Sequence, residues 1–366
     1  MSKVKLSEIG TFKNGLNFSA ERVLSGCKMI GVPDFGDNYL AKLDGLKEVD
    51  EDIVSTDYLL QDNDILFVRS NGNKNLVGRA MLIEKIKEKV TFSGFCIRFR
   101  ITNNNVNPLY MLYLFKSPLF RKLFSNTQQT SISNLNQEIL GNIEVELPTI
   151  GQQNRIVKVI HGITRKIENN KRINDNLSAM AYDIYMHNFF SKKPNAKLKD
   201  ILTEAEKSAI QVGEAKTSNG EYPFFTSGAT ILKWNEPFVD GRNCFLNTGG
   251  NADVKFYVGK AAYSTDTWSI SAKSEMSDYL YLMLFSIKPE LDQKFFQGTG
   301  LKHLQKPLLK DRPIYVPEKR ELEAFNRQVM PMFDIISENT RENQQLTSLR
   351  NWLLPMLMNG QATISD

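Results

Sequence analysis

The sequence predicts an α+β protein in which two similar mixed α/β domains are separated by two long antiparallel helices forming a coiled coil. Three observations lead to this fold class. The chain repeats itself, each repeat begins with short apolar runs between clusters of Gly, Asn, Asp and Ser, and each repeat ends with a long stretch that has helical periodicity. A chain of 366 residues with 41% apolar residues is large enough for two cores.

The repeat is visible as five matches that keep their order along the chain. Lys5–Ile9 returns as Lys197–Ile201, and Ile65–Asn73 returns as Asn243–Asn251. Three later matches share an offset near 169: Tyr110–Phe115 with Leu280–Phe285, Ser131–Leu135 with Gly300–Leu304, and Val145–Pro148 with Ile314–Pro317. Chance would not preserve this order, so we interpret the chain as an internal duplication.

The first part of each repeat has the composition of a strand-rich α+β domain. The second part lacks turn signals and is predicted to be one long helix. Thr149, with Gln152 three residues later, fits a capping box at the start of the first helix. The expected boundaries are 1–148 for the first domain, 149–193 for the first spacer helix, 194–318 for the second domain, 319–360 for the second spacer helix and 361–366 for a tail.

Both predicted helices carry a seam in which steps of three and four residues alternate, as in a coiled coil. Each seam has two Asn residues at matching positions, and a buried Asn pair can fix the register of two helices. The alternative is that each helix packs on its own domain and the Asn residues face water. The seam consists of Ile160, Ile163, Ile167, Asn170, Asn174 and Leu177 in the first helix and Val329, Met332, Ile336, Asn339, Asn343 and Leu346 in the second.

Composition excludes several classes of protein. The net charge of +5, from 46 basic and 41 acidic residues, permits an acidic partner such as nucleic acid but does not demand one. The three cysteines lie far apart and suggest neither a disulfide framework nor a metal site. No apolar run is long enough to span a bilayer, and the first residues lack the apolar stretch of a signal peptide, so we expect a cytoplasmic protein.

The sequence contains no recognisable catalytic constellation, cofactor motif or metal site. It has neither a P-loop nor Gly-x-Gly-x-x-Gly after a strand, and its three histidines have no metal-ligand spacing. Asn107–Tyr110 resembles the Asn-Pro-Pro-Tyr motif of adenine methyltransferases, but it opens an amphipathic helix and is interpreted as a helix start. Asp292-Gln293-Lys294, with Glu290 upstream, resembles the end of a nuclease motif but is short enough to arise by chance. A bivalent binding protein fits better than an enzyme.

The chain resembles the specificity subunit of a type I restriction–modification system along essentially its whole length. The resemblance lies in Leu147-Pro148 followed by Gln152–Val157, in Tyr222–Gly228 and in Leu349–Leu357, taken in order with the duplicated layout. The chain departs from the family pattern in two places. Gly151 precedes Gln152 where the family usually has an acidic residue, and Glu321-Leu322 replaces a Gln pair.

The resemblance implies two target-recognition domains that each recognise one half of a bipartite, asymmetric DNA sequence. Its implied partners are double-stranded DNA, two methylation subunits docked on the helices, and a motor and restriction subunit that joins through the complex. The partners carry S-adenosylmethionine, ATP hydrolysis and cleavage. The chain itself would therefore be no enzyme and bind no cofactor.

Two polar loops in each domain are the expected DNA contacts, because Arg, Lys, Asn and Gln suit base edges and Lys, Arg, Ser and Thr suit phosphates. The same residue types are common in ordinary solvated turns, which is the competing interpretation. The candidates are Arg69, Ser70, Asn71, Asn73, Lys74, Thr127, Gln128, Gln129 and Thr130 in the first domain and Asn247, Thr248, Asn251, Thr299, Lys302 and His303 in the second.

Two other functions remain open from the sequence. A stand-alone methyltransferase or nuclease fragment would bind S-adenosylmethionine or modify DNA by itself. A non-catalytic adaptor that binds proteins would show no salt-dependent association with duplex DNA.

Overall fold

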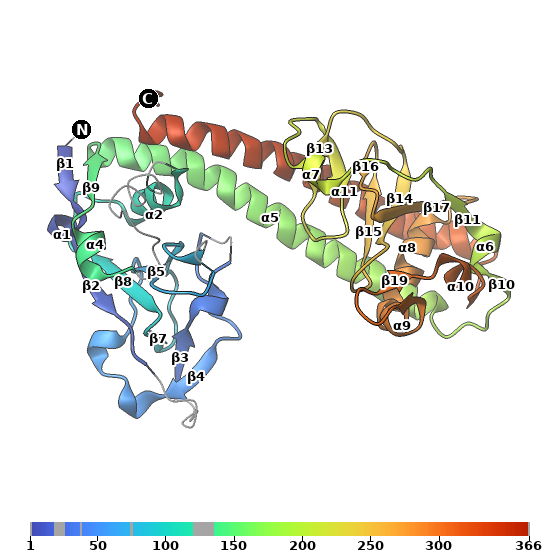
Figure 1. The fold of residues 1–366 in the computed structure, drawn as a ribbon, viewed down its shortest axis with the longest axis horizontal. Helices are drawn as coiled ribbons and strands as arrows, with labels where there is room; N and C mark the ends of the chain where they lie inside the picture. The colour runs from blue at the N-terminus through green and yellow to red at the C-terminus, as the bar shows by residue number, and fades with distance from the viewer. Residues whose placement is uncertain are drawn as a thin grey trace. The chain divides into compact units, whose positions relative to one another are not determined.

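The computed structural model describes residues 2–17, 26–36, 39–73, 76–118, 120 and 135–364. The chain folds into two compact units, Met1–Thr164 with Thr347–Asp366 and Arg165–Leu346. Each unit contains one mixed α/β domain and part of both long helices (Figure 1), which confirms the predicted fold class. Among the described helices, none combines the length and the apolar character needed to cross a membrane.

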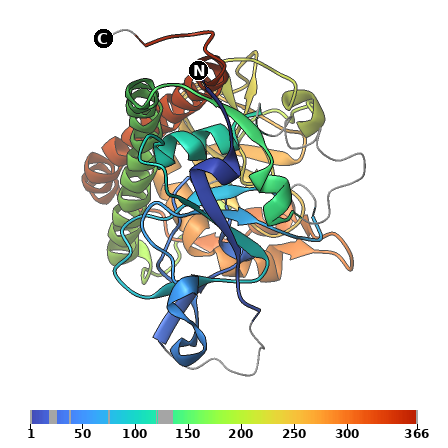
Figure 2. The same cartoon turned by 90° about the vertical axis from the view of Figure 1, so that its left-hand side faces the viewer.

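The first domain begins with a strand, a single helical turn and a second strand, and α1 packs beside α4 (Figure 2). Its strands are β1 (Ser2–Lys5), β2 (Gly10–Asn14), β3 (Gly26–Ile30), β4 (Lys47–Asp50), β5 (Ile65–Val68), β6 (Ala80–Leu82), β7 (Val90–Phe92), β8 (Cys96–Ile101) and β9 (Glu144–Leu147). Its helices are α1 (Leu6–Ile9), α2 (Pro108–Lys116) and α4 (Gln137–Gly141), with 3₁₀ turns at Val32–Asp34, Glu51–Ile53 and Thr56–Tyr58.

The second domain has elements that correspond to the described elements of the first, and it contains the small hairpin β18–β19. Its strands are β10 (Ala196–Lys197), β11 (Leu202–Glu204), β12 (Tyr222–Phe225), β13 (Leu232–Trp234), β14 (Arg242–Asn247), β15 (Val254–Val258), β16 (Ala262–Tyr263), β17 (Thr267–Ala272), β18 (Phe296–Gln297), β19 (His303–Leu304) and β20 (Pro313–Ile314). Its helices are α6 (Leu198–Ile201), α7 (Val212–Ala215), α8 (Ser277–Ser286), α9 (Lys288–Glu290) and α10 (Lys306–Lys310), with a π-helical turn at Leu291–Phe295.

Strand order shows that the two domains are copies of one fold. The antiparallel four-stranded sheet runs β2-β8-β5-β6 in the first domain and β11-β17-β14-β15 in the second. The three-stranded sheets, β4-β3-β7 and β13-β12-β16, each combine one antiparallel and one parallel pair. A two-stranded pair, β1-β9 or β10-β20, joins the start of each domain to its end.

The register of one repeat match is wrong by one residue. Ile65 pairs with Phe99 in β8, and the position in β17 that is equivalent to Phe99 is Ile270. Ile270 pairs with Cys244, so the counterpart of Ile65 is Cys244 and not Asn243. All four residues of β5 are buried, so the strand has no alternation of apolar and polar residues to fix its register from sequence.

The two long helices are α5 (Ile150–Phe189) and α11 (Lys319–Met358), and each is 40 residues long. The start of α5 agrees with the capping box, since the Thr149 hydroxyl accepts a hydrogen bond from the Gln152 N–H at 3.4 Å. The first helix ends four residues before its expected end at 193, and the second ends two before 360.

Antiparallel helix pairing is seen inside each unit, and in the first unit Ile156 near the start of α5 shares one core with Leu357 near the end of α11. In the second unit Asn170 Nδ2 donates to Asn343 Oδ1 at 3.0 Å, and Asn339 Nδ2 donates to Asn174 Oδ1 at 2.8 Å. These two bonds pair earlier residues of α5 with later residues of α11. The alternative in which the Asn residues face water is therefore wrong.

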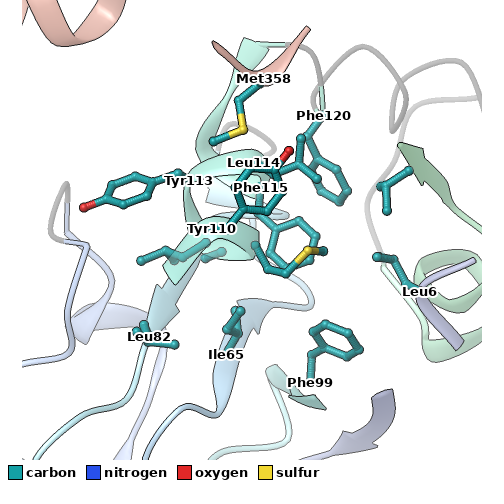
Figure 3. Packing of buried hydrophobic residues seen from close by; sticks show 14 of the residues in the cluster. Leu6, Ile65, Leu82, Phe99, Tyr110, Tyr113, Leu114, Phe115, Phe120 and Met358 are labelled. Atoms are coloured by element: carbon teal, nitrogen blue, oxygen red, sulfur yellow. The ribbon is translucent and has the colours of Figure 1, made fainter. Parts of the chain in front are cut away.

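The core of the first unit combines domain and helix residues. Aromatic rings of α2 pack on the four-stranded sheet, and Met358 of α11 reaches the same cluster (Figure 3). Ile156 and Ile160 of α5 belong to this cluster as well. In the second unit Ala181 and Tyr185 of α5 join Phe325, Val329 and Phe333 of α11 in the corresponding core. Each domain is thus packed firmly against the helix pair of its own unit.

Candidate nucleic-acid interface

The first candidate loop follows β5 and is fixed by backbone hydrogen bonds on both sides. Arg69 N–H donates to the Phe95 carbonyl at 2.7 Å, and the Arg69 carbonyl accepts from Leu135 N–H at 2.8 Å. Asn71 Oδ1 accepts from Asn73 N–H at 2.8 Å and closes the turn. Arg69, Ser70 and Asn71 are half-buried, whereas Asn73 is exposed. The candidates Lys74, Thr127, Gln128, Gln129 and Thr130 lie outside the described residues.

Arg69 borders a hollow of about 690 Å³ in the first domain. One guanidinium nitrogen of Arg69 donates to the Gly94 carbonyl at 3.4 Å, which aligns the side chain along the wall. The wall is mostly apolar with a few polar side chains, a composition typical of binding sites. It is lined by Leu16, Asn17, Met29, Gly31, Val32, Pro33, Asp34, Lys47, Arg69, Ser70, Ser93, Gly94 and Phe95.

In the second domain the structure brings the two candidate loops together. Leu304 N–H donates to the Thr248 carbonyl at 3.0 Å, and Gly250 N–H donates to the Lys302 carbonyl at 2.9 Å. Asn251, Thr299 and His303 are exposed, and Thr248 and Lys302 are half-buried. Segments separated by about 50 residues in the sequence therefore form one polar surface.

Asn247 is a candidate contact whose side chain points inward. It is 3% exposed, its amide nitrogen donates to the Gly249 carbonyl at 2.8 Å, and its amide oxygen accepts from Asp253 N–H at 2.7 Å. A third bond joins the amide nitrogen to the Asn251 carbonyl. Because the amide is used within the loop, Asn247 shapes the loop and does not present a group to a partner in this conformation.

The positive charge of the second surface is partly neutralised. Lys302 Nζ lies 2.9 Å from Asp292 Oδ2, and this hydrogen bond holds the pKa of Asp292 below its usual value. The other oxygen of Asp292 accepts from Ala252 N–H at 3.0 Å, so the carboxylate also anchors the first loop. The intervening turn needs a glycine, because Gly298 has a φ of +146° and a Cβ there would lie 2.6 Å from the Leu301 carbonyl oxygen.

Two exposed residues beside these loops are not among the candidates that the sequence suggested. Phe95 is 59% exposed in the turn before β8, and Asp266 is exposed in the equivalent turn before β17. The carbonyls of both accept from the candidate loops, Phe95 from Arg69 N–H at 2.7 Å and Asp266 from Thr248 N–H at 2.9 Å. An alignment of the repeats around β8 and β17 would have placed the two turns together.

The structure assigns the residues of both motif-like segments to packing and charge pairing. Asn107 caps α2 through Oδ1, which accepts from Tyr110 N–H at 3.2 Å, and its Nδ2 donates to Asn154 at 2.8 Å. Glu290 pairs with Arg312 at 2.8 Å and Asp292 pairs with Lys302. Within the part of the chain that the structure describes, no group of three or more His, Cys, Asp or Glu could hold a metal ion.

Comparisons with known proteins agree with this arrangement. The family model described as the type I restriction modification DNA specificity domain matches residues 1–179 and 192–348. The MjaVIII and MjaIX specificity subunits of type I restriction enzymes from Methanocaldococcus jannaschii are 21% and 20% identical, over 88% and 75% of this chain and 84% and 73% of their own lengths. A crystal structure of the type I restriction–modification S subunit from M. genitalium has a TM-score of 0.63 at 15% identity and covers 97% of this chain and 95% of its own.

Proposed function

The chain belongs to the family of type I restriction modification DNA specificity domains, and we propose that its two domains recognise the two different halves of one bipartite DNA target. As a specificity subunit it recognises DNA, and such subunits are not catalytic by themselves. The observation that carries the bipartite target is the repeated fold with different residues at equivalent loop positions, such as Arg69 and Thr248. Different side chains on the same framework favour an asymmetric target.

The long helices serve in this proposal as spacers. Each begins in one unit and ends in the other, and a helix of 40 residues has a length of roughly 60 Å. Base pairs between the two recognised halves would go unread, so the target would contain a gap of fixed length. Linking two modest binding domains also raises the affinity for the complete site, because the second contact becomes intramolecular.

Membership in the family implies partner subunits for methylation and restriction. We infer that two methylation subunits dock on the helix pair and that the restriction subunit joins through them. The complex would act in the cytoplasm, where the three buried free cysteines of the chain would stay reduced.

The flank of the helix pair in the second unit supports this docking role. The seam pairing puts Lys166 beside Glu342, and their charged atoms lie 3.3 Å apart. One heptad along each helix from these two, the same flank carries Ile173 and Ile335, which are 42% and 44% exposed. The opposite flank faces the domain core through Tyr185 and Phe333. Exposed apolar residues at interhelical positions are expected where another protein binds.

Docking is tested with Ile173→Glu and Ile335→Glu together in the full-length chain. We expect the purified variant to keep its helix content but to lose co-elution with its methylation subunits in size-exclusion chromatography. Phe190→Glu is the control, because it places the same charge on an apolar residue that is 57% exposed and lies after the end of α5. Unchanged co-elution of the double variant would remove this flank from the docking surface.

DNA recognition is tested with the complex of the chain and its methylation subunits. Mapping methylated adenines should yield one bipartite motif, and replacing Arg69 and Lys74 by Ala should weaken duplex binding at low salt. A titration across salt with unchanged affinity would exclude this loop. If the complex shows no salt-dependent association with DNA at all, the protein-binding adaptor becomes the better explanation.

A further inference from the structure

The two turns that precede β8 and β17 are built on the same hydrogen bonds. In the first domain Ser93 N–H donates to the Ile30 carbonyl at 2.9 Å, and Cys96 N–H donates to the Ser93 carbonyl at 2.9 Å. In the second domain Ser264 N–H donates to the Phe225 carbonyl at 2.9 Å, and Thr267 N–H donates to the Ser264 carbonyl at 3.0 Å. The third residue of each turn is therefore held at the same place relative to its sheets.

Each turn is also tied to the candidate DNA loop of its own domain. Phe95 is bonded to Arg69, and Arg69 in turn to Leu135, at 2.7 and 2.8 Å. Asp266 is bonded to Thr248, and Thr248 in turn to Leu304, at 2.9 and 3.0 Å. All of these bonds use backbone atoms only. The side chains of the third turn residues are free to differ without disturbing the framework, and they are opposite in chemistry, a phenyl ring and a carboxylate.

The ring of Phe95 has the properties of a contact residue. It is a large apolar group that is 59% exposed, and Phe95 and Arg69 both line the wall of the hollow in the first domain. In the major groove the one apolar group that distinguishes base pairs is the C5-methyl of thymine, and Arg is the usual partner of guanine O6 and N7. Because a backbone hydrogen bond joins Phe95 to Arg69, the ring and the guanidinium lie close enough to contact neighbouring bases.

Asp266 suits the opposite kind of base edge. A carboxylate repels phosphates and accepts hydrogen bonds only, so its favourable base partner is the exocyclic amine of cytosine. The hydroxyl of its neighbour Thr248 already donates to the Asp266 carbonyl at 3.0 Å, so the Thr248 hydroxyl and the Asp266 carboxylate can both act only as acceptors at this edge.

We propose that Phe95 and Asp266 are specificity-determining residues at equivalent positions, with Phe95 contacting a thymine methyl in one half of the target and Asp266 accepting from a cytosine amine in the other. The inference rests on the proposed function and deepens it. In this proposal the target is asymmetric because the same turn occurs in both domains with a different third residue, Phe95 or Asp266.

The experiment uses the complex of the full chain with its methylation subunits, after its motif has been mapped through methylated adenines. Uracil replaces each thymine of the half-target recognised by the first domain, a change that removes only the methyl group. We expect one such position to weaken binding of the wild-type complex about tenfold and to have no effect on the Phe95→Ala complex. Asp266→Asn, of the same shape, should relax the preference for cytosine at one position of the other half. Phe190→Ala, equally exposed but outside both domains' loops, should change neither half.

The possible failures are distinguishable. If the wild-type complex has no sequence-specific motif, the proposed function fails. If it has a motif whose first half contains no thymine, or in which every thymine-to-uracil exchange leaves binding unchanged, Phe95 has no such role although the function stands. An Asp266→Asn complex with an unchanged motif likewise overturns the assignment of Asp266.

Discussion

The hydrogen-bonded pair Asn170–Asn343 is predicted to fix the register of the two long helices while contributing little net stability. Asn170 is 1% exposed, and its amide donates both to Asn343 at 3.0 Å and to Glu342 at 2.6 Å. Replacing Asn170 by Ala leaves the amide oxygen of the half-buried Asn343 without this donor. An unsatisfied buried polar group costs roughly 1–3 kcal/mol, and we expect a loss of about 2 kcal/mol for the single variant.

The double replacement of Asn170 and Asn343 by Leu should behave in the opposite way. It removes both polar partners and puts two apolar side chains on a largely apolar seam, so stability should be unchanged or higher. The cost of the double variant would then be far below the sum of the two single costs. If the double variant keeps the fold but loses the register, its complex should accept targets with altered gap lengths.

Urea unfolding of the full chain, followed by circular dichroism in the transition of the second unit, measures these differences. Asn176→Ala is the control, because Asn176 is an exposed residue of the same helix and reports the gain in helix propensity alone. A loss for Asn170→Ala no different from the control, or strictly additive costs in the double variant, would refute the reasoning. The reasoning would also be refuted if the double Leu variant became more stable but its complex still accepted targets of only one gap length.

Three further predictions concern the second unit. Burial raises the pKa of Asp278 to about 7, although a nitrogen of Arg242 lies 2.6 Å away and favours the charged carboxylate. The unfolding free energy should therefore fall by about 4 kcal/mol as the pH rises from about 4 to about 7. The variant Asp278→Asn should lose this pH dependence in urea titrations. Asp292→Asn releases Lys302 from an ion pair while keeping an acceptor for the loop, so fluorescence anisotropy should show tighter DNA binding by the complex at low salt; equal affinity would contradict the predicted contact. Gly298→Ala should destabilise its hairpin by about 1–2 kcal/mol in urea unfolding, because its φ is positive and a Cβ would meet a carbonyl.

The helices and the duplication were predictable because their signals are local and repeated. Seam positions recur every three or four residues over 40 residues, and the matching Asn residues identify the partner helix without any knowledge of the domains. The start of α2 was equally readable, since Asn107 followed by Pro108 is a cap followed by a first-turn proline. Signals of this kind survive because they depend on neighbours in the sequence.

The candidate interface was only partly predictable, since it depends on pairing between distant strands. Phe95 adjoins Arg69 because β5 pairs with β8, and Asp266 adjoins Thr248 because β14 pairs with β17. Asn247 has the composition of a contact residue, yet its burial is decided by the close turn around it. Polarity alone cannot separate a residue that builds a loop from one that the loop presents.

The division between backbone framework and exposed side chain explains how one duplicated domain could acquire two specificities. In the hydrogen bonds that position Phe95 and Asp266, these two residues take part only through their own main-chain atoms, so the bonds place no requirement on the residue type there. Substitutions at exposed positions usually change stability by no more than about 0.5 kcal/mol, whereas a changed base contact is worth roughly 1–3 kcal/mol of discrimination. Recognition can therefore change at these positions at almost no cost in folding, while buried framework residues such as Asn247 cannot change without loss of the loop.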